Sequence, residues 1–494
     1  MKDFVARCQS FTDRVALVSE GKPYTYAALL HDSKYLAQFL LGDQPDLLEA
    51  RIAFFIPSSY AYVQTQWAIW RAGGIAVPLC TSHPLPSLEY TIRDTGAQLL
   101  ITTRAHEPFL RPLTHSGSLT IFCLEDLPHD LPTYPPLPEI NSDRKAMILY
   151  TSGTTNLPKG VVSTHRNIQA QIQSLVDAWE WSAEDHILNV LPLHHVHGIV
   201  NVLCCALWSG ASCTLLPKFD PQEVWEHFQN DTLTLFMAVP TIYFKLIAYY
   251  EQTDAATRQI LRTSCGKFRL MVSGSAALPV SVLEKWQTLS GHTLLERYGM
   301  TEIGMALSNP YRGTRRAGHV GLPLPGIQVR LVNEANTPVD PGQPGEIQVK
   351  GDTVFEAYWQ KPEATKDSFT DDGWFRTGDI AVRDEDSYKI LGRNSVDIIK
   401  SGAYKISALE IEEVLRQHPE IRECGVVGLP DEEWGEIIAA ALVVRQPLDE
   451  SDLKAWLKTQ MPAYRIPRKY IYLDDLPRNA LGKVTKNELK GQFK

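Results

Sequence analysis

Short apolar runs alternate with stretches of helical periodicity over most of the chain, and this alternation is the strongest limit on its fold. Residues 14–18 form an apolar run, a Gly21-Lys22 turn follows, and Leu29, Leu36 and Leu40 then lie on one helical face. Strands that alternate with amphipathic helices are typical of α/β proteins. At 494 residues the chain is too long for one hydrophobic core, so we expect two or more domains.

Two regions depart from this alternation. Residues 116–143 are rich in Pro and Asp and predict a long surface connection. From about Thr337 onwards, short apolar runs are separated by Pro/Gly turns such as residues 341–345. Short runs bounded by such turns predict strands, and here they predict a small β-barrel-like part.

A second unit begins near Gly392-Arg393. Ser407 and Glu410 have the spacing of a helix capping box, in which the serine caps the helix and the glutamate bonds back to it. Further helical and strand signals continue to the last residues. We therefore predict an α/β fold with a large N-terminal domain, residues 1–392, and a small C-terminal α+β lid, residues 393–494.

Composition excludes several classes of protein. The net charge of −9 is not the basic charge that is typical of nucleic-acid-binding proteins. The longest apolar runs, residues 437–444 and 199–208, are far shorter than the roughly 20 residues that cross a bilayer. Residues 1–8 lack the apolar core of a signal peptide. Eight scattered cysteines without a C-x-x-C motif predict reduced thiols. We expect a cytoplasmic protein, with the mitochondrial matrix as the alternative in a eukaryote.

The strongest local signal is the hydroxyl-rich segment Tyr150–Gly160, which follows the apolar run 146–149. Its backbone N–H groups, hydroxyls and Lys159 suit a polyphosphate, because together they surround and neutralise an anion. The spacing is not that of a P-loop. A polar surface loop is the alternative.

Further segments make the whole chain resemble the adenylate-forming superfamily of acyl-CoA synthetases, luciferases and peptide-synthetase adenylation domains. The segments occur in the order of that family: 150–160, 269–279, 297–302, 373–379, 392–393 and 477–483. The resemblance implies an acid:CoA ligase with a place in fatty acid metabolism. Such an enzyme forms an acyl-adenylate and pyrophosphate from ATP and then transfers the acyl group to CoA, releasing AMP. It uses Mg²⁺, with ATP and CoA as co-substrates.

The resemblance also assigns the nucleotide site. Tyr298 is expected to stack on adenine, Asp379 to accept bonds from the ribose hydroxyls, and Glu302 to bind Mg²⁺. Arg393 is expected to reach the ribose or the hinge. The other residues implied to contact ATP or AMP are Thr151, Ser152, Gly153, Thr154, Thr155, Lys159, Ser273, Gly274, Ser275, Gly299, Met300, Thr301 and Lys483.

Lys483 is the central catalytic prediction. Adenylation brings a carboxylate to the α-phosphate of ATP, so neutralising two meeting anions dominates catalysis. The resemblance then implies that the lid rotates about a hinge near residues 394–395 and removes Lys483. A CoA tunnel is expected along Ser401, Gly402, Ala403 and Tyr404. The expected catalytic residues are Lys483, Glu302, Thr151 and His195.

The acid is expected to bind near His195, Met305 and Arg297. A buried arginine without a carboxylate partner is costly, and a dicarboxylic acid supplies that partner. The segment 296–310 resembles the malonyl-CoA synthetases, and 391–402 resembles the malonyl/methylmalonyl-CoA ligases of animal mitochondria. We therefore expect malonate and methylmalonate as substrates. An ion pair between Arg297 and Glu296 or another acid is the structural alternative.

Four other functions stay open at this point. The chain is alternatively a ligase for another small or medium carboxylic acid, or a stand-alone adenylation protein that loads a carrier protein. A luciferase-like oxygenase has little support from so polar a site. A nucleotide-sensing protein without catalysis conflicts with the intact set Glu302, Asp379 and Lys483. The sequence says nothing about the oligomeric state.

Overall fold

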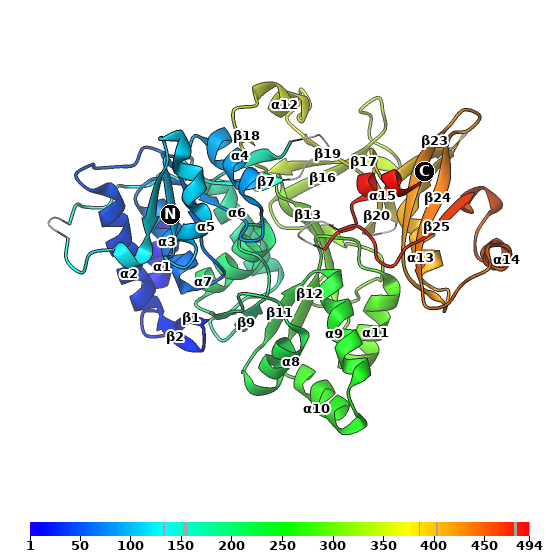
Figure 1. Ribbon diagram of the computed structural model, residues 1–494, viewed down its shortest axis with the longest axis horizontal. Coiled ribbons are helices and arrows are strands. Elements are labelled where there is room, and N and C mark those ends of the chain that lie inside the picture. Colours follow the sequence, from blue (N-terminus) through cyan, green and yellow to red (C-terminus); the bar gives the residue numbers. More distant parts are fainter. Residues whose placement is uncertain (132–133, 152–156, 385, 402–403, 479–481, 494) are drawn as a thin grey trace.

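The computed structural model describes residues 1–131, 134–151, 157–384, 386–401, 404–478 and 482–493. It is a mixed α/β structure with a large N-terminal body and a smaller C-terminal part, which lies at one end of the long axis (Figure 1). This arrangement confirms the predicted fold class.

A nine-stranded sheet carries most of the residues of interest. Its central strands are parallel, and antiparallel strands flank them at both edges. In spatial order the strands are β15 (Leu322–Pro323), β14 (Gly304–Ser308), β13 (Leu295–Met300), β12 (Leu270–Ser273), β11 (Leu235–Ala238), β9 (His186–Asn189), β10 (Ser212–Leu215), β1 (Val15–Ser19) and β2 (Lys22–Thr25). Ligands of open α/β sheets bind beyond the carboxyl ends of such parallel strands.

A second sheet has seven strands. They are β18 (Ala357–Tyr358), β8 (Lys159–Thr164), β7 (Lys145–Thr151), β4 (Ile75–Pro78), β3 (Arg51–Phe55), β5 (Leu99–Thr102) and β6 (Thr120–Cys123). Strand β6 pairs with β5 inside the region that the sequence predicted to be a long connection, so the connection is shorter than predicted. Only four residues long, β6 is too brief to stand out beside its Pro-rich surroundings.

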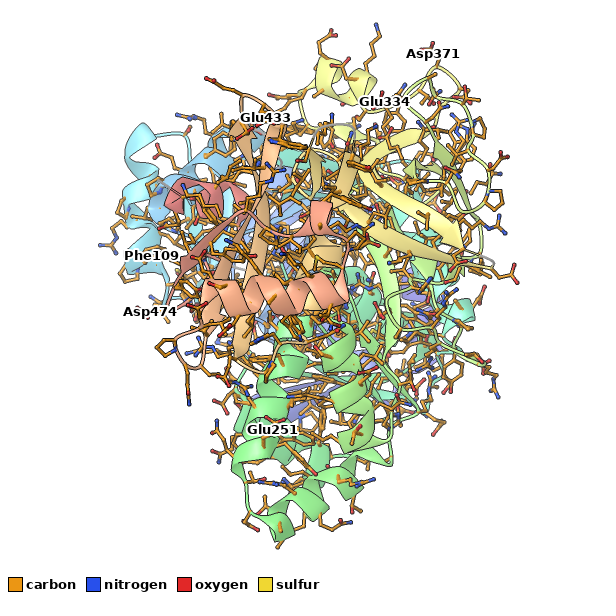
Figure 2. The ribbon with its side chains drawn as sticks, turned by 90° about the vertical axis from the view of Figure 1, so that its right-hand side faces the viewer. Phe109, Glu251, Glu334, Asp371, Glu433 and Asp474 are labelled. Carbon is orange, nitrogen blue, oxygen red and sulfur yellow. The ribbon has the colours of Figure 1, made fainter. Side chains whose placement is uncertain are left out.

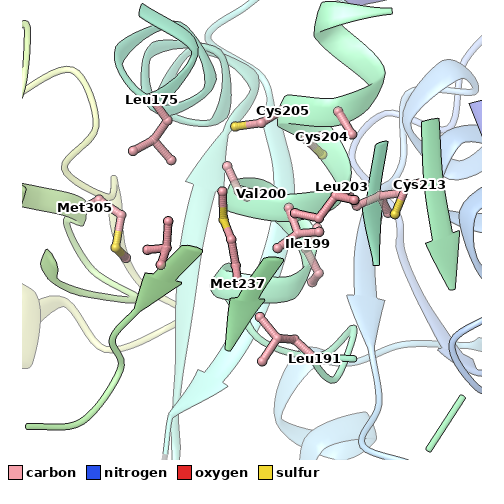
Figure 3. Packing of buried hydrophobic residues seen from close by; sticks show 14 of the residues in the cluster. Leu175, Leu191, Ile199, Val200, Leu203, Cys204, Cys205, Cys213, Met237 and Met305 are labelled. Atoms are coloured by element: carbon pink, nitrogen blue, oxygen red, sulfur yellow. The ribbon is translucent and has the colours of Figure 1, made fainter. Parts of the chain in front are cut away.

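Helix α6 (His165–Ala178) connects the two sheets, because it contacts β8 of one sheet and β14 of the other. A capping box starts it: the Thr164 hydroxyl accepts from the Asn167 N–H, and the Asn167 side chain accepts from the Thr164 N–H. The apolar side of α6 joins a large buried cluster in which Leu175, Val200, Met237 and Met305 lie close to one another (Figure 3). This packing fixes the distance between the two sheets.

Helices cover the remaining faces of the body. Those that precede α6 are α1 (Lys2–Gln9), α2 (Tyr26–Leu41), α3 (Tyr60–Arg71), α4 (Leu85–Thr95) and α5 (Glu107–Leu110), with the short 3₁₀ turns η1 (Arg111–Ser116) and η2 (Leu124–Asp126). Those that follow it are the π-helical segment η3 (His197–Cys204), α7 (Cys205–Ser209), α8 (Pro221–Asn230), α9 (Pro240–Gln252), α10 (Ala255–Cys265), α11 (Val280–Ser290) and α12 (Pro362–Asp367).

The predicted β-barrel-like part is a four-stranded antiparallel sheet. It consists of β16 (Ile327–Val332), β17 (Gly345–Gly351), β19 (Phe375–Asp384) and β20 (Ser387–Arg393). Strand β20 leads directly into the C-terminal part, so this sheet forms the bridge between body and lid (Figure 1).

The lid is an α+β unit. A five-stranded sheet of β21 (Ile398–Ser401), β22 (Tyr404–Ser407), β23 (Ile421–Asp431), β24 (Gly435–Val444) and β25 (Lys469–Tyr472) carries the helices α13 (Ala408–Leu415), α14 (Glu450–Gln460) and α15 (Lys486–Gln492) and the turn η4 (Ala463–Arg465). The Ser407 hydroxyl caps α13 by accepting from the Glu410 N–H, as predicted. The Glu410 carboxylate instead pairs with Lys389 and Arg465. Two buried clusters of the lid contain only residues from 399 onwards.

All eight cysteines are unpaired and buried, as the sequence predicted. Among the described residues no helix is both long and apolar enough to cross a membrane. Charged side chains such as Glu334, Glu433 and Asp474 lie at the outside of the molecule when it is viewed from the lid end (Figure 2).

Candidate active site

Neighbouring parallel strands place Arg297 beside Gly274. In the pairing of β12 with β13, Ser273 is opposite Glu296, so the next residue of each chain segment comes together. A Cβ atom added to Gly274 would lie 2.6 Å from the guanidinium carbon of Arg297. A side chain at position 274 would therefore displace the Arg297 guanidinium from its place against the backbone.

Arg297 is buried without a carboxylate partner in the described part of the chain. Its side chain is 3% exposed, and its Nη2 donates to the Ser275 hydroxyl at 3.2 Å. Burial lowers the pKa of Arg297 to about 9. Glu296, the predicted alternative partner, instead accepts from the Gly318 N–H, and burial raises its pKa to about 8.

His197 completes this cluster. Its Nδ1 lies 3.1 Å from the Ser275 hydroxyl, and burial, with the nearby charge of Arg297, lowers its pKa well below 6.5. The Ser275 oxygen accepts from Arg297, and in the tautomer in which its hydroxyl donates to His197 Nδ1 the imidazole hydrogen is on Nε2. In that tautomer Arg297 Nε, Arg297 Nη1 and His197 Nε2 are three buried donors without a partner among the described residues. Three such donors together fit an anion.

On the other side of the same strand, Tyr298 belongs to a hydrogen-bonded chain. Its hydroxyl donates to Asp379 Oδ2 at 2.6 Å, and Arg393 Nε donates to Asp379 Oδ1 at 3.0 Å. Burial raises the pKa of Tyr298 well above 10, so the hydroxyl stays protonated. The structure thus brings together three residues that the sequence predicted for the nucleotide, from β13, β19 and β20.

Glu302 lies next to Tyr358 and Lys159. The Tyr358 hydroxyl donates to Glu302 Oε1 at 3.0 Å, and the Lys159 ammonium lies 4.9 Å from the centre of the Tyr358 ring. Burial raises the pKa of Glu302, and a cation bound nearby would favour its charged form. No cluster of three or more His, Cys, Asp or Glu that could hold a metal occurs among the described residues. The single carboxylate of Glu302 is a hard oxygen ligand of the kind that Mg²⁺ accepts beside phosphates and water.

The lid places Lys483 at this site. Burial, together with the charges of Arg297 and Arg393 and against the opposing charge of Asp379, lowers the pKa of Lys483 to about 8. A Cβ atom added to Gly482 would lie 3.2 Å from the hydroxyl of Thr241, in the first turn of α9. The lid orientation therefore directs Lys483 to the space between the Arg297 cluster and the Tyr298–Asp379 pair.

A second contact holds the lid in this orientation. The carboxylate of Glu413, in α13, accepts from the Val280 N–H at 3.1 Å, in the first turn of α11. Helix α11 has no side-chain cap of its own, because Pro279 occupies the cap position. A lid residue therefore satisfies a free N–H group of a body helix.

The other predicted site residues have different surroundings. His195 is half-buried, and burial together with His194 and Lys483 lowers its pKa well below 6.5. Met305 is buried in the large apolar cluster (Figure 3). Tyr404 is 53% exposed and stacks on Tyr464 at the lid surface.

Several predicted residues sit in the turns and strand ends around these groups. Thr151 ends β7 opposite Lys159, and Ser273 ends β12 with its side chain fully buried. Gly299 packs so closely against β14 that an added Cβ would lie 2.1 Å from the Gly304 carbonyl oxygen. Outside the described residues lie Ser152, Gly153, Thr154, Thr155, Gly402 and Ala403.

Two residues of the site were missed by the sequence prediction. His197 lies two positions after His195 in a run with three histidines, residues 194–197, and the sequence analysis selected only His195 from this run. Tyr358 comes from a two-residue strand, β18, which gives no sequence signal.

Comparisons with known proteins define the class of this chain. The profile of the AMP-binding enzymes matches residues 4–359, and that of the AMP-binding enzyme C-terminal domain matches residues 410–483. The chain therefore belongs to the AMP-binding enzyme family. This result confirms the predicted resemblance to adenylate-forming enzymes.

Individual relatives narrow the comparison. The chain is 46% identical to the mitochondrial malonate–CoA ligase of Mus musculus, over 99% of the chain and 90% of that protein, and 39% identical to the malonate–CoA ligase of Arabidopsis thaliana, over 97% and 86%. The crystal structure of ATP-bound MatB from Rhodopseudomonas palustris matches with a TM-score of 0.90 and 32% identity, over 99% of this chain and 98% of that one.

Proposed function

We propose that the protein is an ATP-dependent ligase that joins malonate to coenzyme A. In the first step malonate and ATP give malonyl-AMP and pyrophosphate, and in the second the CoA thiol displaces AMP to give malonyl-CoA. The relatives that carry this activity in their names match nearly the whole chain. Methylmalonate is a second substrate in this proposal, because it differs from malonate by one methyl group.

The observation that carries the choice of acid is the set of three buried nitrogen atoms on Arg297 and His197 that have no partner in the described part of the chain. The far carboxylate of a dicarboxylic acid satisfies them, and it neutralises a guanidinium that burial otherwise destabilises. The other carboxylate is then directed towards Lys483. A monocarboxylic acid such as acetate leaves the donors unpaired, and a site built around a polar partner rejects analogues that lack it.

The first step needs charge neutralisation between the attacking carboxylate and the α-phosphate. Lys483 serves this purpose in our proposal, because its ammonium is near enough to Arg297, Arg393 and Asp379 for their charges to shift its pKa. Tyr298 and Asp379 hold the adenosine, while Thr151 and Lys159 border the phosphates. Glu302 would hold Mg²⁺, which neutralises phosphate charge when bound.

The neutral imidazole of His195 lies beside the acid and close to Lys483. A cationic imidazole there would repel Lys483, whereas a neutral one leaves the lysine free to approach the two anions. We assign His195 to the wall of the acid site, with Met305 as part of the buried apolar packing beneath it.

The second step requires Lys483 to leave and the thiol to enter. In our proposal residues 393–494 turn as one unit about residues 394–395, and Ser401 and Tyr404 then line the path of CoA. Separate buried clusters in the lid support movement as a unit. The Glu413–Val280 and Gly482–Thr241 contacts join lid and body, so both are broken by such a rotation.

We also propose that the protein works in a reducing compartment, because its eight cysteines are all unpaired. The cytoplasm and the mitochondrial matrix both meet this condition. The mouse relative is named as a mitochondrial protein, which supports the mitochondrial alternative. Imaging of a tagged full-length protein in its own cells distinguishes the two.

One experiment tests the activity and the acid together. CoA-dependent AMP release is measured with malonate, methylmalonate, succinate, acetate, propionate and octanoate at matched concentrations. We expect malonate and methylmalonate to have the highest kcat/KM, with acetate and propionate at least about 10³ lower. Equal turnover of acetate and malonate would refute the assignment of the acid, and AMP release without CoA consumption would refute the second step.

A further inference from the structure

Cys80 lies in a small polar cluster that the proposed reaction does not use. The residue follows strand β4, and its sulfur is 3.1 Å from the hydroxyl of Ser82. The imidazoles of His83 and His194 are near enough to the same sulfur to shift its pKa, and their ring centres are 6.2 Å apart. Two separate chain segments, the turn before α4 and the loop after β9, thus meet at one thiol.

This environment differs from that of every other cysteine. Burial raises the pKa of Cys80, but hydrogen bonds from His194 and His83 more than offset this effect and lower the pKa to about 5. The Cys80 contact in turn raises the pKa of His83, as expected for a thiolate–imidazolium pair. Burial raises the pKa of the remaining seven cysteines: Cys8, Cys123, Cys204, Cys205, Cys213, Cys265 and Cys424.

The cluster is close to both solvent and the active site. Residues 81–84, which follow Cys80 directly in the chain, are exposed, and Cys80 itself is 4% exposed. On its inner side the His194 ring lies 4.1 Å from the ring of His195, centre to centre. The charge of Lys483 acts on His195 in turn. A group attached to Cys80 therefore displaces the loop that forms one wall of the acid site.

We propose that Cys80 is a reactive thiolate whose oxidation by hydroperoxides reversibly switches the ligase off. The thiolate attacks one oxygen of hydrogen peroxide, an S–O bond forms, the O–O bond breaks, and hydroxide leaves. The sulfur is oxidised by two electrons to a sulfenic acid while the peroxide is reduced. A thiol then condenses with the sulfenic acid to a mixed disulfide and water, and a second thiol restores Cys80.

The first test measures reactivity without using enzymatic activity. The reduced full-length protein is treated with iodoacetamide at pH 6, and the alkylation rate of each cysteine is followed by peptide mass spectrometry. Cys123 is the internal control. It is 5% exposed, almost the same as Cys80, but no histidine is among the groups that shift its pKa. We expect Cys80 to react at least about tenfold faster, since its larger thiolate fraction outweighs its lower intrinsic nucleophilicity.

Replacement of His83 by Gln removes one imidazole and should move the pH midpoint of Cys80 alkylation upwards. Alkylation of Cys80 no faster than that of Cys123, or an unchanged midpoint in H83Q, overturns the proposal. These results do not depend on which acid the enzyme uses.

The second test links the modification to activity. Hydrogen peroxide should abolish pyrophosphate release in the unmodified protein and in C123S, and dithiothreitol should restore it. C80S should keep its initial activity and resist peroxide. Dimedone labelling of Cys80 should parallel the loss. If C80S is inhibited as fast as the unmodified protein, or if labelled protein stays active, the regulatory role is wrong.

Discussion

Replacement of Arg297 by Met is the sharpest test of the acid site, because it should raise stability while it removes function. Burial lowers the pKa of Arg297 from 12.5 to about 9. At about 1.4 kcal/mol per pKa unit, this shift corresponds to about 5 kcal/mol of destabilisation by the charged form. The folded-state pKa is depressed, so the destabilisation is fully present below pH 9 and is lost as the pH rises from there towards 12.5.

A dicarboxylic acid that pairs with Arg297 recovers much of this free energy in the bound state. About 5 kcal/mol corresponds to a factor between 10³ and 10⁴. We therefore expect Arg297→Met to lower kcat/KM for malonate by about 10³ or more and to leave the value for acetate nearly unchanged. The ligand-free variant should unfold at a higher temperature than the original protein, and malonate should stabilise it much less.

Pyrophosphate release gives the kinetic values, and scanning calorimetry with and without malonate gives the stabilities. Arg315→Met is the matched control. Burial also lowers the pKa of Arg315, but its guanidinium donates to the carbonyl oxygens of Thr293 and Tyr311. This control should lose stability and keep the preference for malonate. A malonate kcat/KM within about threefold of the original in the Arg297 variant would refute the reasoning.

Three further predictions concern the lid. Lys483→Ala should slow adenylation by about 10²–10³, and thioester formation from supplied malonyl-AMP should survive; equal loss of both steps in single-turnover assays contradicts this role. Because burial lowers the pKa of Lys483 to about 8, the lysine is an ammonium well below that pH and loses its charge above it. The kcat/KM for adenylation should therefore decline above pH 8. The decline should disappear in Lys483→Arg. Glu413→Gln weakens the hydrogen bond from the Val280 N–H and should slow adenylation several-fold relative to thioester formation. Glu423→Gln is the control, because the Glu423 carboxylate pairs with Arg478 inside the lid. This control should leave the ratio of the two rates unchanged.

Local sequence patterns predicted the parts of the protein that depend on neighbouring residues. The alternation of strands and helices gave the α/β class, and the Ser407 cap was found because a cap is set within four residues. Tyr298, Asp379 and Lys483 were selected through a family resemblance that preserves their order along the chain.

The acid cluster depends on contacts that spacing does not reveal. Ser275 and His197 are 78 positions apart, and Tyr358 and Glu302 are 56 apart. Ser275 was assigned to the nucleotide, yet its hydroxyl contacts Arg297 and His197. Its φ of 68° is uncommon for a residue other than glycine and shows that the tertiary structure determines this turn.

Strand β13 carries Arg297 and Tyr298 as neighbours whose side chains leave on opposite faces. One face meets the acid cluster and the other the bonds to Asp379. Under the proposed roles of Arg297 and Tyr298, mutation at a single codon changes which acid is accepted without disturbing the position of the adenosine. Such a strand allows a new acid to be accepted after few mutations, because the adenosine contacts are inherited unchanged while the acid contacts vary.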